Sequence, residues 1–216
     1  GGQAGGKLGD ISSFQLIYQD GIVLIKKYWK QYHVPILLLG YDLGGLIAMQ
    51  VAHSISDPII EGIVLISPIW KLEQRWKHIF LYPVLSVGKL FSKSANNQQV
   101  LEEQLEETYF EEYKELSKND PLRLKKMSYR MFKAILDLIR NTHSLKRRLN
   151  LPCRIFQGTQ DPVVNHYAVH QLYEKWAHPN KKIRLYENTG HNLLMDQYVV
   201  EIQEEILTFI QDLIGK

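Results

Sequence analysis

Two hydrophobic patterns alternate along the chain. Continuous apolar runs of about six residues, bounded by turn residues, are typical of strands buried on both faces of a parallel sheet. Such runs occupy 34–39 and 62–68, and two further strands, in which polar or charged residues interrupt the apolar ones, are expected at 153–158 and 182–187. Apolar residues that recur every three or four positions are typical of amphipathic helices. These stretches cover about 12–32, 46–54, 165–176 and 196–214. The alternation of strand and helix predicts an α/β protein with a mostly parallel sheet and helices on both faces.

The stretch between the second and third strands is long and helical. Helical patterns cover 101–116 and 122–139, and insertions of this length in α/β folds are typical of lids or caps. The second helix carries an apolar stripe that favours packing against the body of the protein, formed by Met127, Met131, Phe132, Ile135, Leu138 and Ile139. We therefore expect a first part of the core at 1–68, a helical cap at 69–150 and the rest of the core at 151–216.

The turn after the first strand is rich in glycine and has Asp42 at its tip. Gly40, Gly44 and Gly45 allow a sharp bend from strand into helix. This is the layout of a nucleophile elbow, G-x-Nuc-x-G, in which a strained turn presents a reactive side chain. Most such turns carry serine. An aspartate can attack carbon and form an ester, but in acyl transfer its product would be an anhydride. A solvated aspartate in a glycine-rich turn is the alternative interpretation.

Asp161 and His191 follow the ends of two later strands. In a parallel sheet, ligands collect at the carboxyl ends of the strands, so we expect Asp42, Asp161 and His191 to lie near one another. Their order along the chain, nucleophile, acid and histidine, is that of the α/β-hydrolases. Each residue is weak evidence by itself, because such residues also cap turns. Together they predict a catalytic site.

Composition narrows the class of protein. The chain has 216 residues and a net charge of +3, which suits one core and does not indicate a nucleic-acid partner. Its single cysteine, Cys153, excludes an internal disulfide and favours packing in a strand. No apolar run reaches transmembrane length, so we expect a soluble protein, intracellular by preference, with peripheral membrane contact left open. The histidines show no metal-ligand spacing, and the arrangement of acid and histidine predicts neither a metal nor an organic cofactor.

Several motifs together resemble one family. They are Ser12-Ser13-Phe14 with Asp20, Leu38 to Gly45, Gly62 to Pro68, Asn119 to Leu122, Gly158 to Asp161 and Tyr186 to His191. From Gly6 to its end the chain resembles the monoacylglycerol lipase and lysophospholipase branch of the α/β-hydrolases, also labelled serine aminopeptidase S33-like. The resemblance implies that Asp161 is the triad acid, that His191 is the general base and that the Leu43 backbone amide belongs to the oxyanion hole. It also implies a lipid or small ester-like ligand under the cap.

Two departures from this family shape the functional hypothesis. Asp42 occupies the serine position, and the family's early strands and His-Gly loop should lie before Gly1. We therefore expect an N-terminally incomplete fold, either a fragment or a piece that relies on a partner chain. The first hypothesis is a descendant of carboxylic ester hydrolases with weak or no activity, a pseudoenzyme.

Two further hypotheses stay open. One is an active hydrolase with an aspartate nucleophile, of the epoxide hydrolase or haloalkane dehalogenase type. Those families commonly place tryptophan after the aspartate, where Leu43 stands here. The other is a structural subunit of a larger assembly.

Overall fold

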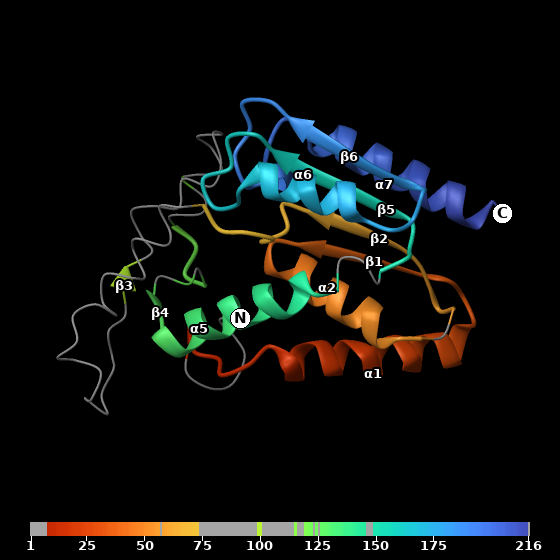
Figure 1. The fold of residues 1–216 in the computed structure, drawn as a ribbon, viewed down its shortest axis with the longest axis horizontal. Helices are drawn as coiled ribbons and strands as arrows, with labels where there is room; N and C mark the ends of the chain where they lie inside the picture. The colour runs from red at the N-terminus through yellow and green to blue at the C-terminus, as the bar shows by residue number, and fades with distance from the viewer. Residues whose placement is uncertain are drawn as a thin grey trace.

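A parallel sheet of four strands forms the centre of the protein. The computed structural model describes residues 8–56, 58–73, 99–100, 115, 119–122, 124, 126–145 and 149–215. The strands are β1 (Ile36–Tyr41), β2 (Ile60–Ile66), β5 (Cys153–Gly158) and β6 (Lys181–Tyr186). They pair in the order β1-β2-β5-β6, and every pair is parallel (Figure 1). This confirms the predicted α/β class, and the carboxyl ends of all four strands lie at one edge of the sheet.

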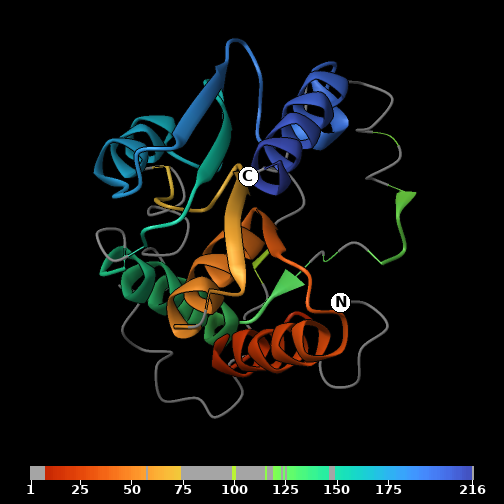
Figure 2. The same cartoon turned by 90° about the vertical axis from the view of Figure 1, so that its right-hand side faces the viewer.

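Helices cover the two faces of this sheet unequally. One side carries α1 (Gln15–Tyr32), α2 (Leu43–Ser54), α5 (Tyr129–His143) and α6 (His166–Lys175), and the other carries α7 (Val199–Ile214) (Figures 1 and 2). The larger buried cluster joins β2 and β5 to the first group of helices. A smaller cluster joins the opposite face of the same strands to α7. The short helix η2 (Leu193–Met195) precedes α7, which begins three residues later than the sequence pattern predicts.

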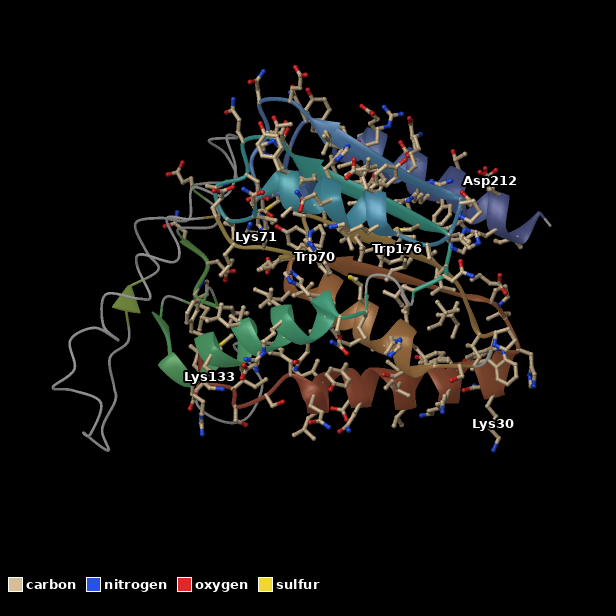
Figure 3. The ribbon with its side chains drawn as sticks, in the orientation of Figure 1. Lys30, Trp70, Lys71, Lys133, Trp176 and Asp212 are labelled. Carbon is tan, nitrogen blue, oxygen red and sulfur yellow. The ribbon has the colours of Figure 1, made fainter. Side chains whose placement is uncertain are left out.

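Two tryptophans anchor the larger cluster. Trp70 and Trp176 are 4% and 2% exposed, and in Figure 3 both point into the interior, whereas Lys30 and Lys133 point away from the body. The Trp176 indole donates a hydrogen bond to the Leu151 carbonyl oxygen at 2.8 Å. Because a buried indole N–H needs an acceptor, this bond lets Trp176 pack between the helical layer and the start of β5.

Helix α5 packs against the body, as its apolar stripe predicts. Ala134, Ile135, Leu138 and Ile139 lie in the larger buried cluster. Across this interface the Gln50 side-chain amide donates to the Thr142 hydroxyl at 2.9 Å. The helix 101–116 and most of the cap lie outside the described residues. The division of the chain at 69–150 therefore stays a prediction.

The predicted start of this helix at residue 122 is wrong. The carboxylate of Asp120 accepts a hydrogen bond from the Leu122 backbone N–H, which makes a turn. Residues Lys126–Met127 then form β4, which pairs with β3 (Gln99–Val100). The helix begins only after Ser128, whose hydroxyl accepts from the Met131 N–H at 3.0 Å as an N-cap.

Helix α1 packs on the body along one face only. Phe14 is buried, and Tyr18, Ile22 and Ile25 pack on the same cluster. Ile17, in contrast, is 40% exposed, because it lies one position away from the residues that face α2. Trp29 is 37% exposed and its ring contacts His33 at the end of the helix. The helix therefore meets the body along a single narrow stripe.

Candidate active site

The turn between β1 and α2 presents Asp42 with a strained backbone. Asp42 has φ 56° and ψ −123°, a conformation that is costly for a residue with a side chain and that clusters at functional sites. A Cβ on Gly40 would lie 2.5 Å from the Gly44 carbonyl oxygen, so only glycine lets the helix turn back so closely. Gly44 has open space around its own Cα. The bend therefore depends on Gly40 far more than on Gly44.

Asp161 is held in the loop that follows β5. One carboxylate oxygen, Oδ1, accepts from the backbone N–H groups of Val163 at 2.8 Å and Val164 at 2.9 Å. The other, Oδ2, accepts from the Gln157 side-chain amide at 2.7 Å. The side chain of Asp161 is wholly enclosed. These donors compensate a buried carboxylate for the water it has lost and fix its orientation.

His191 lies in the loop after β6, which approaches the end of β5 very closely. A Cβ on Gly158 would lie 2.2 Å from the Gly190 carbonyl oxygen and 2.3 Å from that of Thr189, so a side chain at this position would push the loops apart. Ser67, which has a φ of 44°, donates from its hydroxyl to the His191 carbonyl oxygen at 2.7 Å. Both contacts fix the histidine loop against its neighbouring strands.

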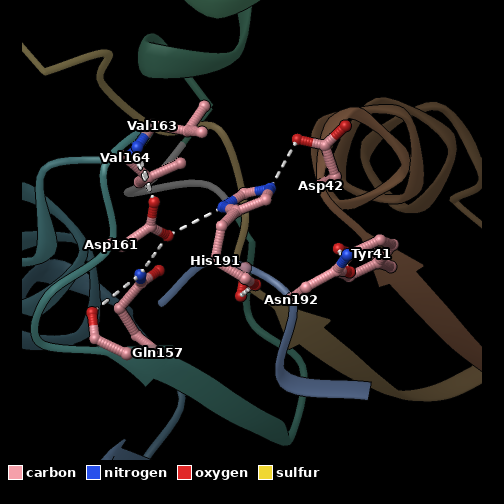
Figure 4. Close-up of polar contacts among 10 residues, drawn as sticks. Tyr41, Asp42, Gln157, Asp161, Val163, Val164, His191 and Asn192 are labelled. Atoms are coloured by element: carbon pink, nitrogen blue, oxygen red, sulfur yellow. Dashed lines mark hydrogen bonds and ion pairs between the residues drawn. The ribbon is translucent and has the colours of Figure 1, made fainter. Parts of the chain in front are cut away.

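The structure brings the three predicted residues together (Figure 4). The Nδ1 atom of His191 lies 2.8 Å from Oδ2 of Asp161, and its Nε2 atom lies 3.1 Å from Oδ1 of Asp42. The imidazole therefore sits between two carboxylates, one at the position of a triad acid and one at the position of a nucleophile.

This geometry decides the charge of His191. A neutral imidazole has one N–H group, yet both ring nitrogens here face carboxylate oxygens, which only accept hydrogen bonds. Burial by itself lowers the pKa of His191, but the hydrogen bonds to Asp161 and Asp42 outweigh it and raise the pKa to about 10. His191 is therefore an imidazolium at neutral pH, with both N–H groups donating.

The N-terminus of α2 completes the surroundings of Asp42. Leu43 is the first residue of this helix, so its backbone N–H has no acceptor within the helix. The helix dipole favours negative charge at this end. The Leu43 amide, which the family resemblance assigns to the oxyanion hole, thus lies directly beside Asp42.

Three residues at the site were not among the predicted functional residues. Gln157 and Ser67 contact the acid and the histidine, as described above, and Tyr41 donates from its hydroxyl to the side-chain oxygen of Asn192. Ser67 lies in a motif that carried the family resemblance, but nothing in the sequence indicated its contact. Tyr41 is the last residue of β1 and Gln157 is the residue before the last of β5. A polar side chain at the end of a mostly apolar strand is the one signal that could have indicated them.

Other predicted features have plain structural outcomes. Cys153 is fully buried, and burial raises the pKa of its thiol, which agrees with a packing role. Within the described part of the chain, no group of three histidine, cysteine or acidic side chains could hold a metal ion. None of the helices described is long and apolar enough to cross a membrane.

A parallel sheet with a sharp strand-to-helix turn, a loop acid and a loop histidine at its carboxyl edge defines an α/β-hydrolase fold. The chain belongs to the serine aminopeptidase S33 family, whose model matches residues 1–198. Solved structures share the fold. A monoacylglycerol lipase of Paleococcus ferrophilus has a TM-score of 0.73 at 18% identity, covering 91% of this chain and 76% of that one. A soluble variant of the monoglyceride lipase of Saccharomyces cerevisiae, with a substrate analog, has a TM-score of 0.76 at 15% identity, covering 95% and 71%.

Curated relatives carry similar names. The chain is 26% identical over 195 residues to phospholipase YtpA of Bacillus subtilis (strain 168), which covers 86% of this chain and 71% of that protein. It is 26% identical over 208 residues to monoglyceride lipase of Mus musculus, which covers 89% of this chain and 63% of that protein. The chain therefore spans 63% to 71% of the length of these two relatives. Together, the family match and these relatives confirm the expected relation to monoacylglycerol lipases.

Proposed function

We propose that this protein descends from lipid-ester hydrolases and has weak or no ester hydrolase activity, because Asp42 replaces the serine nucleophile. The observation that carries the proposal is the 3.1 Å contact between Nε2 of His191 and Oδ1 of Asp42. In a working triad this nitrogen accepts a proton from the nucleophile's hydroxyl. Here it faces a carboxylate, which has no such proton to give.

The contact disables two steps of acyl transfer. An imidazolium has no free lone pair on either nitrogen, so His191 cannot act as a general base until it loses a proton. The hydrogen bonds to two carboxylates oppose that loss. In addition, attack of the Asp42 carboxylate on an ester carbonyl would give an anhydride rather than an acyl-serine. Both effects act at the same residue, so activity depends on position 42.

The acid and the histidine of the site are kept beside the Leu43 amide, which favours a retained binding role. Asp161 and His191 keep the hydrogen bond of a triad, at 2.8 Å, and the Leu43 amide remains a donor for an anionic or carbonyl oxygen beside Asp42. The names of the relatives, phospholipase and monoglyceride lipase, support a lipid or small ester-like ligand. We place this ligand under the predicted cap.

Turnover of p-nitrophenyl esters and of monoacylglycerol tests the proposal. We expect the natural protein and Asp42→Ala to hydrolyse both substrates no faster than the buffer does. Asp212→Ala, which removes an exposed carboxylate on α7 (Figure 3), is the matched control for handling and contaminating activity. Clear turnover by the natural protein that persists in Asp212→Ala and disappears in Asp42→Ala would contradict the proposal.

A further inference from the structure

The side chain of a buried glutamine, Gln157, contacts the carboxylate of Asp161. Gln157 lies near the end of β5 and is fully buried. Its side-chain N–H groups donate to Oδ2 of Asp161 at 2.7 Å and to the Gly158 carbonyl oxygen at 3.1 Å (Figure 4). Oδ2 is also the oxygen that accepts from His191. Gln157 and His191 therefore share one acceptor atom.

The orientation of this amide is imposed by its acceptors. If it were reversed, its oxygen would face two other oxygens and both hydrogen bonds would be lost. In the orientation present, the amide oxygen Oε1 is buried without a hydrogen-bond partner among the described residues. An orphaned buried acceptor costs free energy, and an apolar side chain of the same shape would avoid that cost. Gln157 therefore offsets part of the cost of burying Asp161, but at this position it leaves one of its own polar atoms without a partner.

We propose that Gln157 is a positioning residue, which shares the Asp161 oxygen with His191 and thereby makes the imidazolium easier to deprotonate. The positive end of its amide dipole points at Oδ2, where it stabilises the negative charge of Asp161 and opposes a cation on the adjacent ring. Val163 and Val164 hold the other oxygen of Asp161, so the carboxylate keeps its place without Gln157. The contribution of Gln157 is then mainly electrostatic. This inference rests on the geometry of the site and holds whether or not the protein hydrolyses esters.

Among the described residues, three other side chains act on the His191 ring or contact it. The charged groups that act on the ring are Asp161, from the loop after β5, and Asp42, from the elbow. The ring of Tyr41, on β1, is tilted against it with centroids 5.9 Å apart. None of these groups changes when Gln157 is replaced, so a shift in the titration of His191 reports on the amide.

Titration of His191 by NMR, through its ring carbon signal, tests the inference in the full protein. In Gln157→Met, which keeps the shape and removes the donor, we expect the proton dissociation constant of His191 to fall by about threefold to tenfold, that is, a higher pKa. A purely structural role would loosen the pair between Asp161 and His191 and shift the titration in the opposite direction.

A matched control separates the effect from general damage to the core. Gln50 is also a buried glutamine whose side-chain amide donates a hydrogen bond, here to the Thr142 hydroxyl, but it lies between α2 and α5. Gln50→Met should leave the titration of His191 unchanged. An unchanged or lowered His191 pKa in Gln157→Met would overturn the inference. Because the readout is a titration, it does not depend on turnover, and activity found in the ester assay would overturn the proposed function alone.

Discussion

The two carboxylates that flank His191 are held in very different ways. Asp161 is enclosed, and its oxygens accept from two backbone amides, from Gln157 and from His191. The Asp42 side chain is 33% exposed, and the hydrogen bond described for its carboxylate is to His191. The Asp161 side chain is therefore held by several buried hydrogen bonds, whereas the place of Asp42 is set mainly by the backbone of the turn. This difference fits our proposal that the residue at position 42 was exchanged while the acid and the histidine were kept.

The largest expected difference is in stability. We expect Asp161→Ala to lower the free energy of unfolding by about 3–5 kcal/mol, because it leaves several buried donors without an acceptor and removes one of the two carboxylates that face the buried His191 cation. Asp42→Ala should cost about 1 kcal/mol or less, since its ion pair is partly exposed and His191 keeps Asp161. Urea unfolding at neutral pH measures both values. Equal losses in the two variants would show that the carboxylates are held alike, against the comparison above.

Glycine substitutions in the elbow should separate its backbone from its side chain. Gly40→Ala should destabilise the protein by roughly 2 kcal/mol or more, because the added Cβ would meet backbone atoms of Gly44 and Gly45 at 2.5 Å. Gly44→Ala meets open space within α2 and should stabilise by up to about 1 kcal/mol. Thermal unfolding of the two variants compares them directly. A Gly40→Ala protein as stable as Gly44→Ala would show that the turn is less tight than described.

Stability should also fall with rising pH. The pKa of His191 is raised from 6.5 to about 10 in the folded protein. The folded protein therefore holds a proton that the unfolded chain loses. This stabilisation is complete below about pH 6.5 and disappears as pH rises toward 10. In Asp42→Asn one of the two carboxylates becomes neutral, so the fall should be smaller.

Urea unfolding between pH 6 and pH 10 in both proteins measures this effect. Other titrating groups are common to the two proteins and cancel in the difference. Identical pH dependence in the natural protein and Asp42→Asn would mean that Asp42 does not hold the proton on His191.

The smallest expected effect is an absence of covalent chemistry at Asp42. Incubation with epoxides or haloalkanes should add no mass to the peptide that contains Asp42, either in the natural protein or in His191→Gln, where an ester intermediate would accumulate. Mass spectrometry of the digested protein detects such an adduct. Its appearance in His191→Gln would favour the aspartate-nucleophile hypothesis over a site that only binds.

Much of the fold follows from short apolar runs. The run at 153–158 coincides with β5, and those predicted at 34–39 and 62–68 lie within two residues of β1 and β2. A short apolar run buries side chains on both of its faces when it forms a central strand of a parallel sheet, so this pattern predicts strands well. The start of α5 was missed because Met127 continues the apolar stripe of the helix although it belongs to β4. The spacing of apolar residues carries no information about the N-cap at Ser128, where the helix begins.

The site was predictable in its topology but not in its energetics. Asp42, Asp161 and His191 each follow a strand end, and parallel strands bring such positions to one edge. The protonation of His191 could not be predicted, because it depends on which oxygens face each ring nitrogen. Gln157 was missed for a similar reason. The role of this polar residue in a buried strand depends on its hydrogen bond to Asp161 in the following loop, and the sequence does not show that contact.

The most direct test of the account is to return a hydroxyl to position 42. Asp42→Ser should raise the turnover of a short-chain p-nitrophenyl ester by about a hundredfold or more over Asp42→Ala, because His191 can then take a proton from the serine. The double variant Asp42→Ser with His191→Gln should lose this gain. If Asp42→Ser folds, shows the histidine titration of a neutral imidazole and still hydrolyses nothing, the claim that a working frame surrounds an exchanged nucleophile is contradicted.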